Sequence, residues 1–544
     1  MVKRKRSDAP VAAAKKAAPQ PLKSALKSST PKSALKSSTP KSALKSASHA
    51  SNKPAAPKNA PGASAPKSKP KTKQAPAPVP APAPPTDGPF SIQIVTGSYD
   101  RVLHGMTVRI AGSTTSFADT FLFNAHTSAI RCLAVSPPSV PIAGQTQKVF
   151  LASGSTDERI NIYNLSAHEP KTAPTEASAD DKLLAALAPR PIRENKKNRE
   201  VGALMHHSSS VTALAFPTRG KLLSAAEDST IAVTRARDWQ LLSTIKVPIP
   251  KAHGRPTGDT AVFGGQPAGV NSFAVHPSLK VMISVSKGEK SMRLWNLVTG
   301  KKAGVLNFGR DLLVQAGEGK HSSGEGRQVV WGSTAEGGDE FAVAFERDVV
   351  VFGMDSTPRC VVLGDVRTKV HRVAYVRVDD AEAGDAVLAV STEDGRVLFY
   401  STRAADLHAA TDDDDGEDLP TAKLLAQVGG RAAGVATRIK DFKVLRGYDG
   451  AFYVVGGSSD GRVRVWRMAA EMLAAAEHGK SAKKVKTQDK AEKAVAQGEL
   501  LGTYETQNRI TCLEAFVLIP RPEGLEDSDE EESESESDEE SDDE

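Results

Sequence analysis

The chain has 544 residues, of which 71 are Lys or Arg, 65 are Asp or Glu and only three are Cys. Cys132, Cys360 and Cys512 stand singly in apolar runs, which excludes a disulfide-stapled fold and paired CxxC metal ligands. No run approaches the about 18 apolar residues that a membrane-spanning helix needs, so we expect an intracellular protein with no membrane association.

Residues 1–89 form a basic segment with 18 Lys and Arg against two acids, a net charge of +16. Pro, Ala, Lys and Ser dominate it, so it cannot bury enough apolar surface to offset chain entropy, and we expect disorder. Its first cluster is typical of a nuclear import signal: Lys3, Arg4, Lys5 and Arg6. The later lysines suit salt-sensitive contacts with RNA phosphates that read no sequence. A solvated tail without a partner is the alternative.

Beyond this segment one sequence motif recurs: a short apolar run, a Gly/Ser-rich turn with an acid, and a second apolar run that often ends in an aromatic residue. The motif occupies Phe150–Tyr163, Leu222–Val233, Met282–Trp295, Val387–Tyr400 and Tyr453–Trp466. Short runs rich in Val, Ile, Leu and Phe between turn residues are typical of strands. Repeated units of this kind cannot bury an apolar face alone and stack around a shared core. The repeat predicts an all-β fold, a seven-bladed β-propeller.

Four copies of the motif have an Asp in the turn: Asp157, Asp228, Asp394 and Asp460. In two of them the next residue is Gly, which supplies the positive φ of a tight hairpin, while the carboxylate accepts backbone N–H bonds. Because each copy has the same local context, we expect these acids to stabilise blade turns and not to be catalytic.

The propeller is expected within residues 90–522. Four stretches of low hydrophobicity or high helix propensity are predicted to be insertions, near 166–200, 248–268, 403–435 and 469–498. The remainder divides into seven repeats of about 45 residues, the usual size of a four-stranded blade. Six blades fit between Ala125 and Met468. We expect the seventh to combine Ser91–Ile110 with Leu500–Ile519, because a closed ring has no exposed sheet edges.

Residues 523–544 hold 15 Asp and Glu and no base, a net charge of −15, and we expect them to be disordered. Five serines have an acid three residues on, the spacing that acid-directed kinases favour, and are candidate phosphosites: Ser528, Ser533, Ser535, Ser537 and Ser541. Each phosphate would add roughly −1.5 to −2 charges, making a polyanion for basic partners or for the N-terminal lysines. A passive solubilising tail is the alternative.

Patterns that carry catalysis are absent from the sequence. Gly479-Lys480-Ser481 ends like a phosphate-binding loop, but Ala474 stands where the first glycine belongs. His206 and His207 are adjacent, so on a strand they point to opposite faces and cannot chelate one metal. There is no GxSxG or HExxH motif. We therefore expect no enzyme, no catalytic residues, no cofactor and no metal.

Several stretches within the repeats are more specific to one family than the general motif is. Among them are Gly97–Asp100, Gly202–Ser208, Val275–Pro277 and Arg293–Val298. From about Ile92 to Val517 the chain resembles WD-repeat propellers, and most closely the eukaryotic maintenance-of-killer family, whose animal members are called PAK-interacting WD-repeat proteins. No blade in this chain ends in a literal Trp-Asp pair. We therefore expect the hydrogen-bond relay typical of WD repeats to be incomplete.

The resemblance implies a non-enzymatic scaffold in biogenesis of the large (60S) ribosomal subunit, in the nucleus and nucleolus. The implied partners are pre-60S ribosomal proteins and rRNA, with RNA contacted non-specifically through the basic tail and the chain a monomer within a large complex. The family's reported role as a binding inhibitor of a protein kinase gives the alternative, a negative regulator of p21-activated-kinase-type signalling. A chromatin adaptor would also suit the basic N-terminus and the tails.

Overall fold

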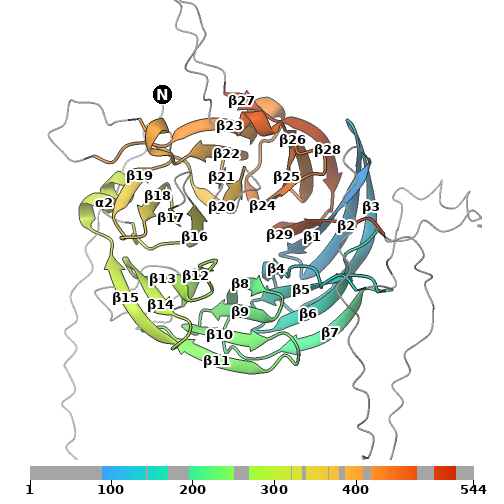
Figure 1. Ribbon diagram of the computed structural model, residues 1–544, viewed down its shortest axis with the longest axis horizontal. Helices are drawn as coiled ribbons and strands as arrows, with labels where there is room; N and C mark the ends of the chain where they lie inside the picture. Colours follow the sequence, from blue (N-terminus) through green and yellow to red (C-terminus); the bar gives the residue numbers. More distant parts are fainter. Residues whose placement is uncertain are drawn as a thin grey trace, which may run out of the picture. The chain divides into compact units, whose positions relative to one another are not determined.

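The structure is a computed structural model that describes residues 88–142, 145–169, 195, 197–249, 269–319, 322–333, 338–364, 367–378, 386–408, 418–473 and 495–521. Within these ranges, seven β-sheets form a ring (Figure 1). The predicted seven-bladed propeller is confirmed. The predictions for residues 1–87 and 522–544, including the import signal and the five serines, lie outside the described residues.

Each blade has four strands that follow one another from the centre of the ring outward. The closing blade holds β29 (Ile510–Val517), β1 (Phe90–Ser98), β2 (Val102–Ala111) and β3 (Thr114–Asn124). The next three blades hold β4 (Ile130–Val135), β5 (Lys148–Ser155), β6 (Ile160–Ser166) and β7 (Arg199–Leu204); β8 (Val211–Thr218), β9 (Lys221–Ala226), β10 (Thr230–Arg235) and β11 (Leu241–Lys246); and β12 (Val270–Val275), β13 (Val281–Ser286), β14 (Ser291–Asn296) and β15 (Lys301–Asn307).

The last three blades complete the ring. They hold β16 (Gln328–Ser333), β17 (Asp339–Ala344), β18 (Val349–Gly353) and β19 (Pro358–Val361); β20 (Val370–Arg377), β21 (Ala386–Thr392), β22 (Arg396–Ser401) and β23 (Lys423–Gly429); and β24 (Ile439–Arg446), β25 (Phe452–Ser458), β26 (Arg462–Met468) and β28 (Glu499–Glu505). The short β27 (Ala496–Gln497) adds a parallel pair to β23. A short helix, α2 (Arg310–Gln315), lies between β15 and β16.

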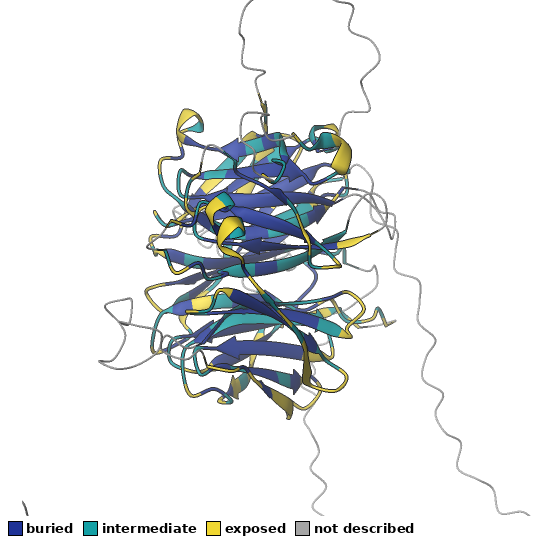
Figure 2. Ribbon diagram, turned by 90° about the vertical axis from the view of Figure 1, so that its left-hand side faces the viewer, coloured by how far each residue is buried: buried dark blue, intermediate teal, exposed yellow. Residues whose placement is uncertain are grey.

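The hydrophobic core lies between neighbouring blades. Phe399 of β22 and Trp466 of β26 belong to one buried cluster although their strands are in adjacent blades. Gly456 allows the close approach of the indole, since a Cβ there would lie 2.9 Å from the Trp466 ring. Figure 2 shows buried residues along the strands and exposed residues mainly in the connections. Each sheet is therefore covered on both faces, which explains the nearly continuous apolar runs in the sequence.

The two ends of the propeller meet in the closing blade. β29 pairs with β1 in a register that sets Ile94 opposite Ala515, and the Leu518 N–H donates to the Ser91 carbonyl at 2.9 Å. Ile94 and Leu513 then pack with Val455 of the preceding blade in one buried cluster. The ring is closed by strands from opposite ends of the domain.

Two details of the sequence-based division are corrected. The prediction placed all of residues 500–519 in the closing blade, but β28 pairs with β26 and only β29 joins β1. The predicted insertion 403–435 contains β23, the outer strand of its blade. Both are outer strands, whose solvent-facing side permits polar residues, so their apolar pattern is weak.

The strand order sorts the connections onto two faces of the ring. Strands are counted from the centre of the ring outward, and neighbouring strands are antiparallel. The hairpins between second and third strands therefore lie on the same face of the ring as the links between blades. We call this face the turn face. The other hairpins lie on the opposite face, the insertion face. Three of the predicted insertions, near 166–200, 403–435 and 469–498, interrupt third-to-fourth hairpins and so leave from the insertion face, as do the start of β1 and the end of β29. Among the described residues, no helix is long and apolar enough to cross a bilayer.

Replacing Trp466 with Ala should lower the free energy of unfolding by about 3–5 kcal/mol, because the side chain is 1% exposed and its removal leaves a cavity between two blades. Leu500 is the cross-strand partner of Trp466 but is 42% exposed, so Leu500→Ala should cost less than about 1 kcal/mol. Urea denaturation of both variants checks this. Equal losses would contradict a core between blades.

Candidate interaction surfaces

Asp157 lies in the β5–β6 turn on the turn face and is the centre of a hydrogen-bond network. Its carboxylate accepts from the backbone N–H groups of Thr127 at 3.0 Å and Arg159 at 3.1 Å, and lies 3.1 Å from Nδ1 of His126. Burial lowers the pKa of His126, so the imidazole is neutral: Nδ1–H donates to Asp157 and Nε2 accepts from the Ser153 hydroxyl at 2.8 Å. Partial burial opposes ionisation of Asp157, but these hydrogen bonds prevail and its pKa is lowered.

Asp228 repeats this arrangement one blade further. Nδ1 of His207 lies 3.1 Å from its carboxylate, and Nε2 of His207 lies 2.8 Å from the Ser224 hydroxyl. Thr230 N–H donates at 2.9 Å and Ser208 N–H at 3.2 Å. Despite burial, these donors lower the pKa of Asp228 to about 2. The His–Ser–Asp relay is thus present in two adjacent blades.

Asp394 and Asp460 occupy the same turn position in two other blades, but they pair with arginine. Arg396 Nε donates to Asp394 at 2.6 Å, and Arg464 Nη2 donates to Asp460 at 3.0 Å. Burial opposes ionisation in both, yet the arginine hydrogen bonds lower both pKa values. Guanidinium groups supply here the donors that histidine supplies in the relay.

Two further turns hold acids that depart from the repeated pattern. Glu289 pairs with Arg293 in the β13–β14 turn. Asp348, before β18, is fully buried and accepts from the N–H groups of Val349 at 2.7 Å and Leu363 at 2.8 Å. Burial raises the pKa of Asp348 to about 6, although these donors and Arg367 oppose the rise. The relay differs from blade to blade while each acid still has partners.

The three thiols are free, and Cys360 and Cys512 are buried while Cys132 is half-buried. Burial raises the pKa of Cys132 and of Cys360 to about 12, and it also raises the pKa of Cys512 well above its ordinary value. Thiols in this state are not thiolate nucleophiles at neutral pH. In the described ranges, no three His, Cys, Asp or Glu side chains gather as a metal site.

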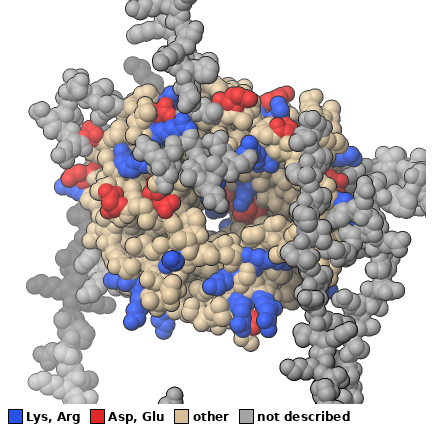
Figure 3. All heavy atoms as spheres, in the orientation of Figure 1, with Lys and Arg blue, Asp and Glu red and all other residues tan. Residues whose placement is uncertain are grey.

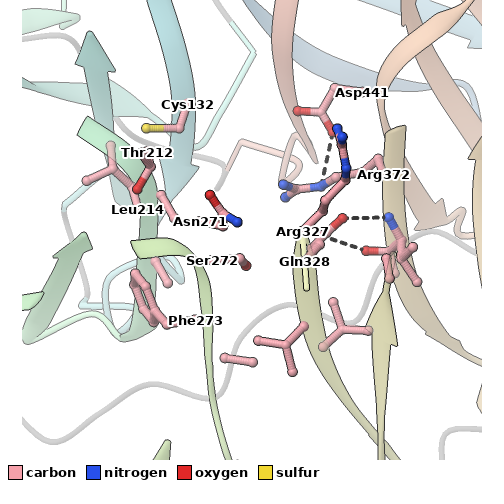
Figure 4. Close-up of a pocket in the computed structure, with 18 of the residues that line it drawn as sticks. Cys132, Thr212, Leu214, Asn271, Ser272, Phe273, Arg327, Gln328, Arg372 and Asp441 are labelled. Atoms are coloured by element: carbon pink, nitrogen blue, oxygen red, sulfur yellow. Dashed lines mark hydrogen bonds and ion pairs between the residues drawn. The ribbon is translucent and has the colours of Figure 1, made fainter. Parts of the chain in front are cut away.

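The central channel contains a cavity of about 640 Å³ lined by the inner strands (Figure 4). Arg372 of β20 pairs there with Asp441 of the neighbouring inner strand β24, with Nε 3.2 Å from Oδ1. Asp441 also accepts from the backbone N–H of Leu513 in β29 at 3.0 Å. One carboxylate therefore joins three consecutive inner strands, including the strand that closes the ring.

Acids at the turn-face mouth of the channel are each held between two bases. Glu346 lies 3.4 Å from Arg327 and 3.3 Å from Lys369 of the next blade. Two other acids follow the same plan, Glu227 with Arg131 and Lys287, and Glu393 with His371 and Arg438. These pairs bind neighbouring blades to one another and neutralise much of the charge of this rim.

Comparison with known proteins agrees with the relay geometry. The family described as WD domain, G-beta repeat matches residues 118–164 and 198–233, and these two segments contain the two His–Ser–Asp relays. The chain therefore contains WD repeats. WD-repeat propellers are generally non-enzymatic scaffolds, and no enzymatic family is indicated for this chain.

The relatives match most of the length of this chain. A p21-activated protein kinase-interacting protein 1-like from Xenopus laevis is 26% identical over 428 residues, which cover 78% of this chain and 82% of that protein. Protein MAK11 of Saccharomyces cerevisiae is 28% identical over 409 residues, covering 69% and 78% respectively. A Gallus gallus protein named like the Xenopus one is 24% identical over 377 residues, covering 69% and 73%. The chain is homologous to these proteins.

Replacing Asp228 with Asn should destabilise the propeller by about 1.5–3 kcal/mol at pH 7, because charge-assisted hydrogen bonds from His207 and backbone N–H groups are lost. The folded pKa of about 2 lies below the ordinary 3.8, so the contribution of the carboxylate is present above pH 4 and is lost as the pH falls toward 2. Urea denaturation at a series of pH values should show the gap between the two proteins narrowing in that window.

Asp311→Asn, in the exposed first turn of α2, provides the matched control and should change stability by less than about 0.5 kcal/mol at every pH. A gap at Asp228 that stays constant down to pH 2 would mean that the ionised carboxylate does not stabilise the turn.

Proposed function

We propose that this WD-repeat protein is a non-catalytic scaffold in biogenesis of the large ribosomal subunit, acting on nucleolar precursor particles that contain rRNA. The similarity to MAK11 over 78% of that protein carries the proposal, since the family that the chain resembles implies this role. The described structure supports a binding role, because it is a β-propeller with WD repeats, a fold that generally serves as a non-enzymatic scaffold.

The terminal segments fit the same proposal. Lys3, Arg4, Lys5 and Arg6 would direct the chain to the nucleus, and the remaining N-terminal lysines would contact rRNA phosphates. Phosphorylation at Ser528, Ser533, Ser535, Ser537 and Ser541 would strengthen the acidic segment for contacts with basic ribosomal proteins. Mass spectrometry of the C-terminal peptide from the particle-bound chain tests the modification, and unmodified serines would remove it.

A second candidate is a negative regulator that binds a p21-activated-type kinase. It is favoured by the names of the Xenopus and chicken relatives, which describe proteins that interact with such a kinase. Binding of this kind would survive nuclease treatment and moderate salt, because it joins two folded proteins and not a protein and a phosphate backbone.

Sucrose-gradient sedimentation of the tagged chain from nuclear extract separates the two candidates. The scaffold role predicts that the chain migrates with precursor large-subunit RNA, that it is absent from mature subunits, and that RNase moves it to lighter fractions. Migration at the top of the gradient with and without RNase, or recovery only outside the nucleus, would contradict this role. Co-migration with a kinase after RNase would then favour the second candidate.

A further inference from the structure

Two aromatic rings from neighbouring blades meet near the insertion face. Phe150 of β5 and Trp239 of the β10–β11 turn have ring centroids 5.2 Å apart at 82°, an edge-to-face contact. Arg219 of the β8–β9 turn places its guanidinium carbon 4.4 Å from the Phe150 centroid and donates to the Lys148 carbonyl at 2.6 Å. These contacts fix an Arg–Phe–Trp cluster across the boundary between two blades. All three residues are half-buried.

Trp239 occupies a position that other blades give to small residues. It lies in the third-to-fourth hairpin with φ +54°, and the corresponding hairpins of three other blades have positive φ at Gly112, Gly300 and Ser356. Left-handed backbone is unfavourable for a bulky side chain, so glycine is the expected residue there. The half-buried indole is therefore held in a strained turn, where it packs on Phe150 and against the buried cluster that contains Val211 and Leu222.

Basic side chains surround this ring pair, and acids are few. Lys221, at the start of β9, is the cross-strand partner of Arg235, and Arg237 follows in the same turn as Trp239. The one acid in that turn, Asp238, pairs with Arg235. In the described part of the chain, Lys221 and Arg237 are exposed and have no acidic partner. Figure 3 shows one face of the ring with Lys and Arg gathered over its lower part, where the β8–β11 and β12–β15 blades lie.

The charges of the channel contrast with those of this cluster. Arg372 is paired with Asp441, and the rim bases Arg327 and Lys369 share Glu346. Their charges are satisfied within the propeller, whereas those of Lys221 and Arg237 are available to a polyanion from outside.

We propose that the aromatic–basic patch, formed by Lys148, Phe150, Arg219, Lys221, Arg237 and Trp239, binds single-stranded RNA. The Lys and Arg side chains would bind consecutive phosphates of the RNA. The accessible part of the Trp239 indole would stack on one unpaired nucleobase. The rings select a single strand, because bases in a duplex are already stacked. Recognition would be tolerant of sequence, since every base has a π-face. This inference rests on the proposed function, in which the precursor particle supplies such RNA.

Fluorescence anisotropy of the purified full-length chain with a labelled single-stranded oligouridylate, over a KCl series, tests the patch. The double variant Lys221→Ala/Arg237→Ala should weaken binding about tenfold. It should also reduce the slope of log affinity against log salt concentration by about 1.4, because each of two lost phosphate contacts on a single strand contributes about 0.7. The matched control removes two exposed bases of the turn face, Lys290→Ala/Arg431→Ala, and should stay within about twofold of wild type. The basic N-terminal segment is identical in all of these proteins, so differences report the patch.

Trp239→Gly tests the ring itself. Glycine adopts the positive φ that Gly300 shows in the next blade, so the turn is retained while the indole is lost. We expect binding about tenfold weaker with an unchanged salt slope, since stacking releases no counterions, and Trp239→Phe should restore most of the affinity. Thermal melting identifies any variant that fails to fold.

Affinities of the patch variants equal to that of the control pair would overturn the inference, as would equal binding of a duplex RNA. If the patch variants lose binding to polyglutamate, an acidic peptide, but keep RNA binding, the patch binds a protein partner and the inference is wrong. Because the assay uses purified components, its failure leaves the gradient test of the proposed function unaffected, and failure in the gradient leaves RNA binding by the patch standing.

Discussion

The pairing of β29 with β1 is the interaction on which the rest of the propeller depends. Every blade buries its apolar faces against two neighbours, so a ring that is open at one boundary would expose two sheet faces to water. Ile94 and Leu513 fill the boundary between the closing blade and the β24–β28 blade. The Leu513 N–H also donates to Asp441, which in turn holds Arg372 of the blade before. Closure is thus coupled to the polar network of the channel.

Closure also decides how the two faces of the ring are used. The turn face has short hairpins whose acids are held by histidine, arginine or backbone donors, and its rim is crossed by ion pairs between blades. Most of the long connections leave from the insertion face. Because Ile92 and Val517 are cross-strand partners, the start of β1 and the end of β29 lie close together on that face. Paired acids therefore stabilise the turn face, while most of the long connections and both ends of the closing sheet leave from the insertion face.

The sequence predicts the propeller because its strongest signals are local. The apolar runs, the turn residues and the acids Asp157, Asp228, Asp394 and Asp460 all lie within single hairpins. The number of blades follows from the length that remains without the insertions, divided by the usual size of a blade. Outer strands were misplaced where one side faces solvent, as for β23 and β28, since polar residues there imitate a loop. Contacts between blades could not be predicted at all. The Phe150–Trp239 pair and the Arg372–Asp441 pair join residues far apart in the sequence, and no local pattern marks either partner.

Hydrogen–deuterium exchange of the folded chain, followed by mass spectrometry of its peptides, tests closure of the ring most directly. If β29 is an integral strand, amides of residues 510–517 should exchange only through global unfolding and as slowly as those of β25, residues 452–458. Much faster exchange in 510–517 while 452–458 stays protected would show that the ring opens at this boundary, and would contradict closure by the two ends of the domain.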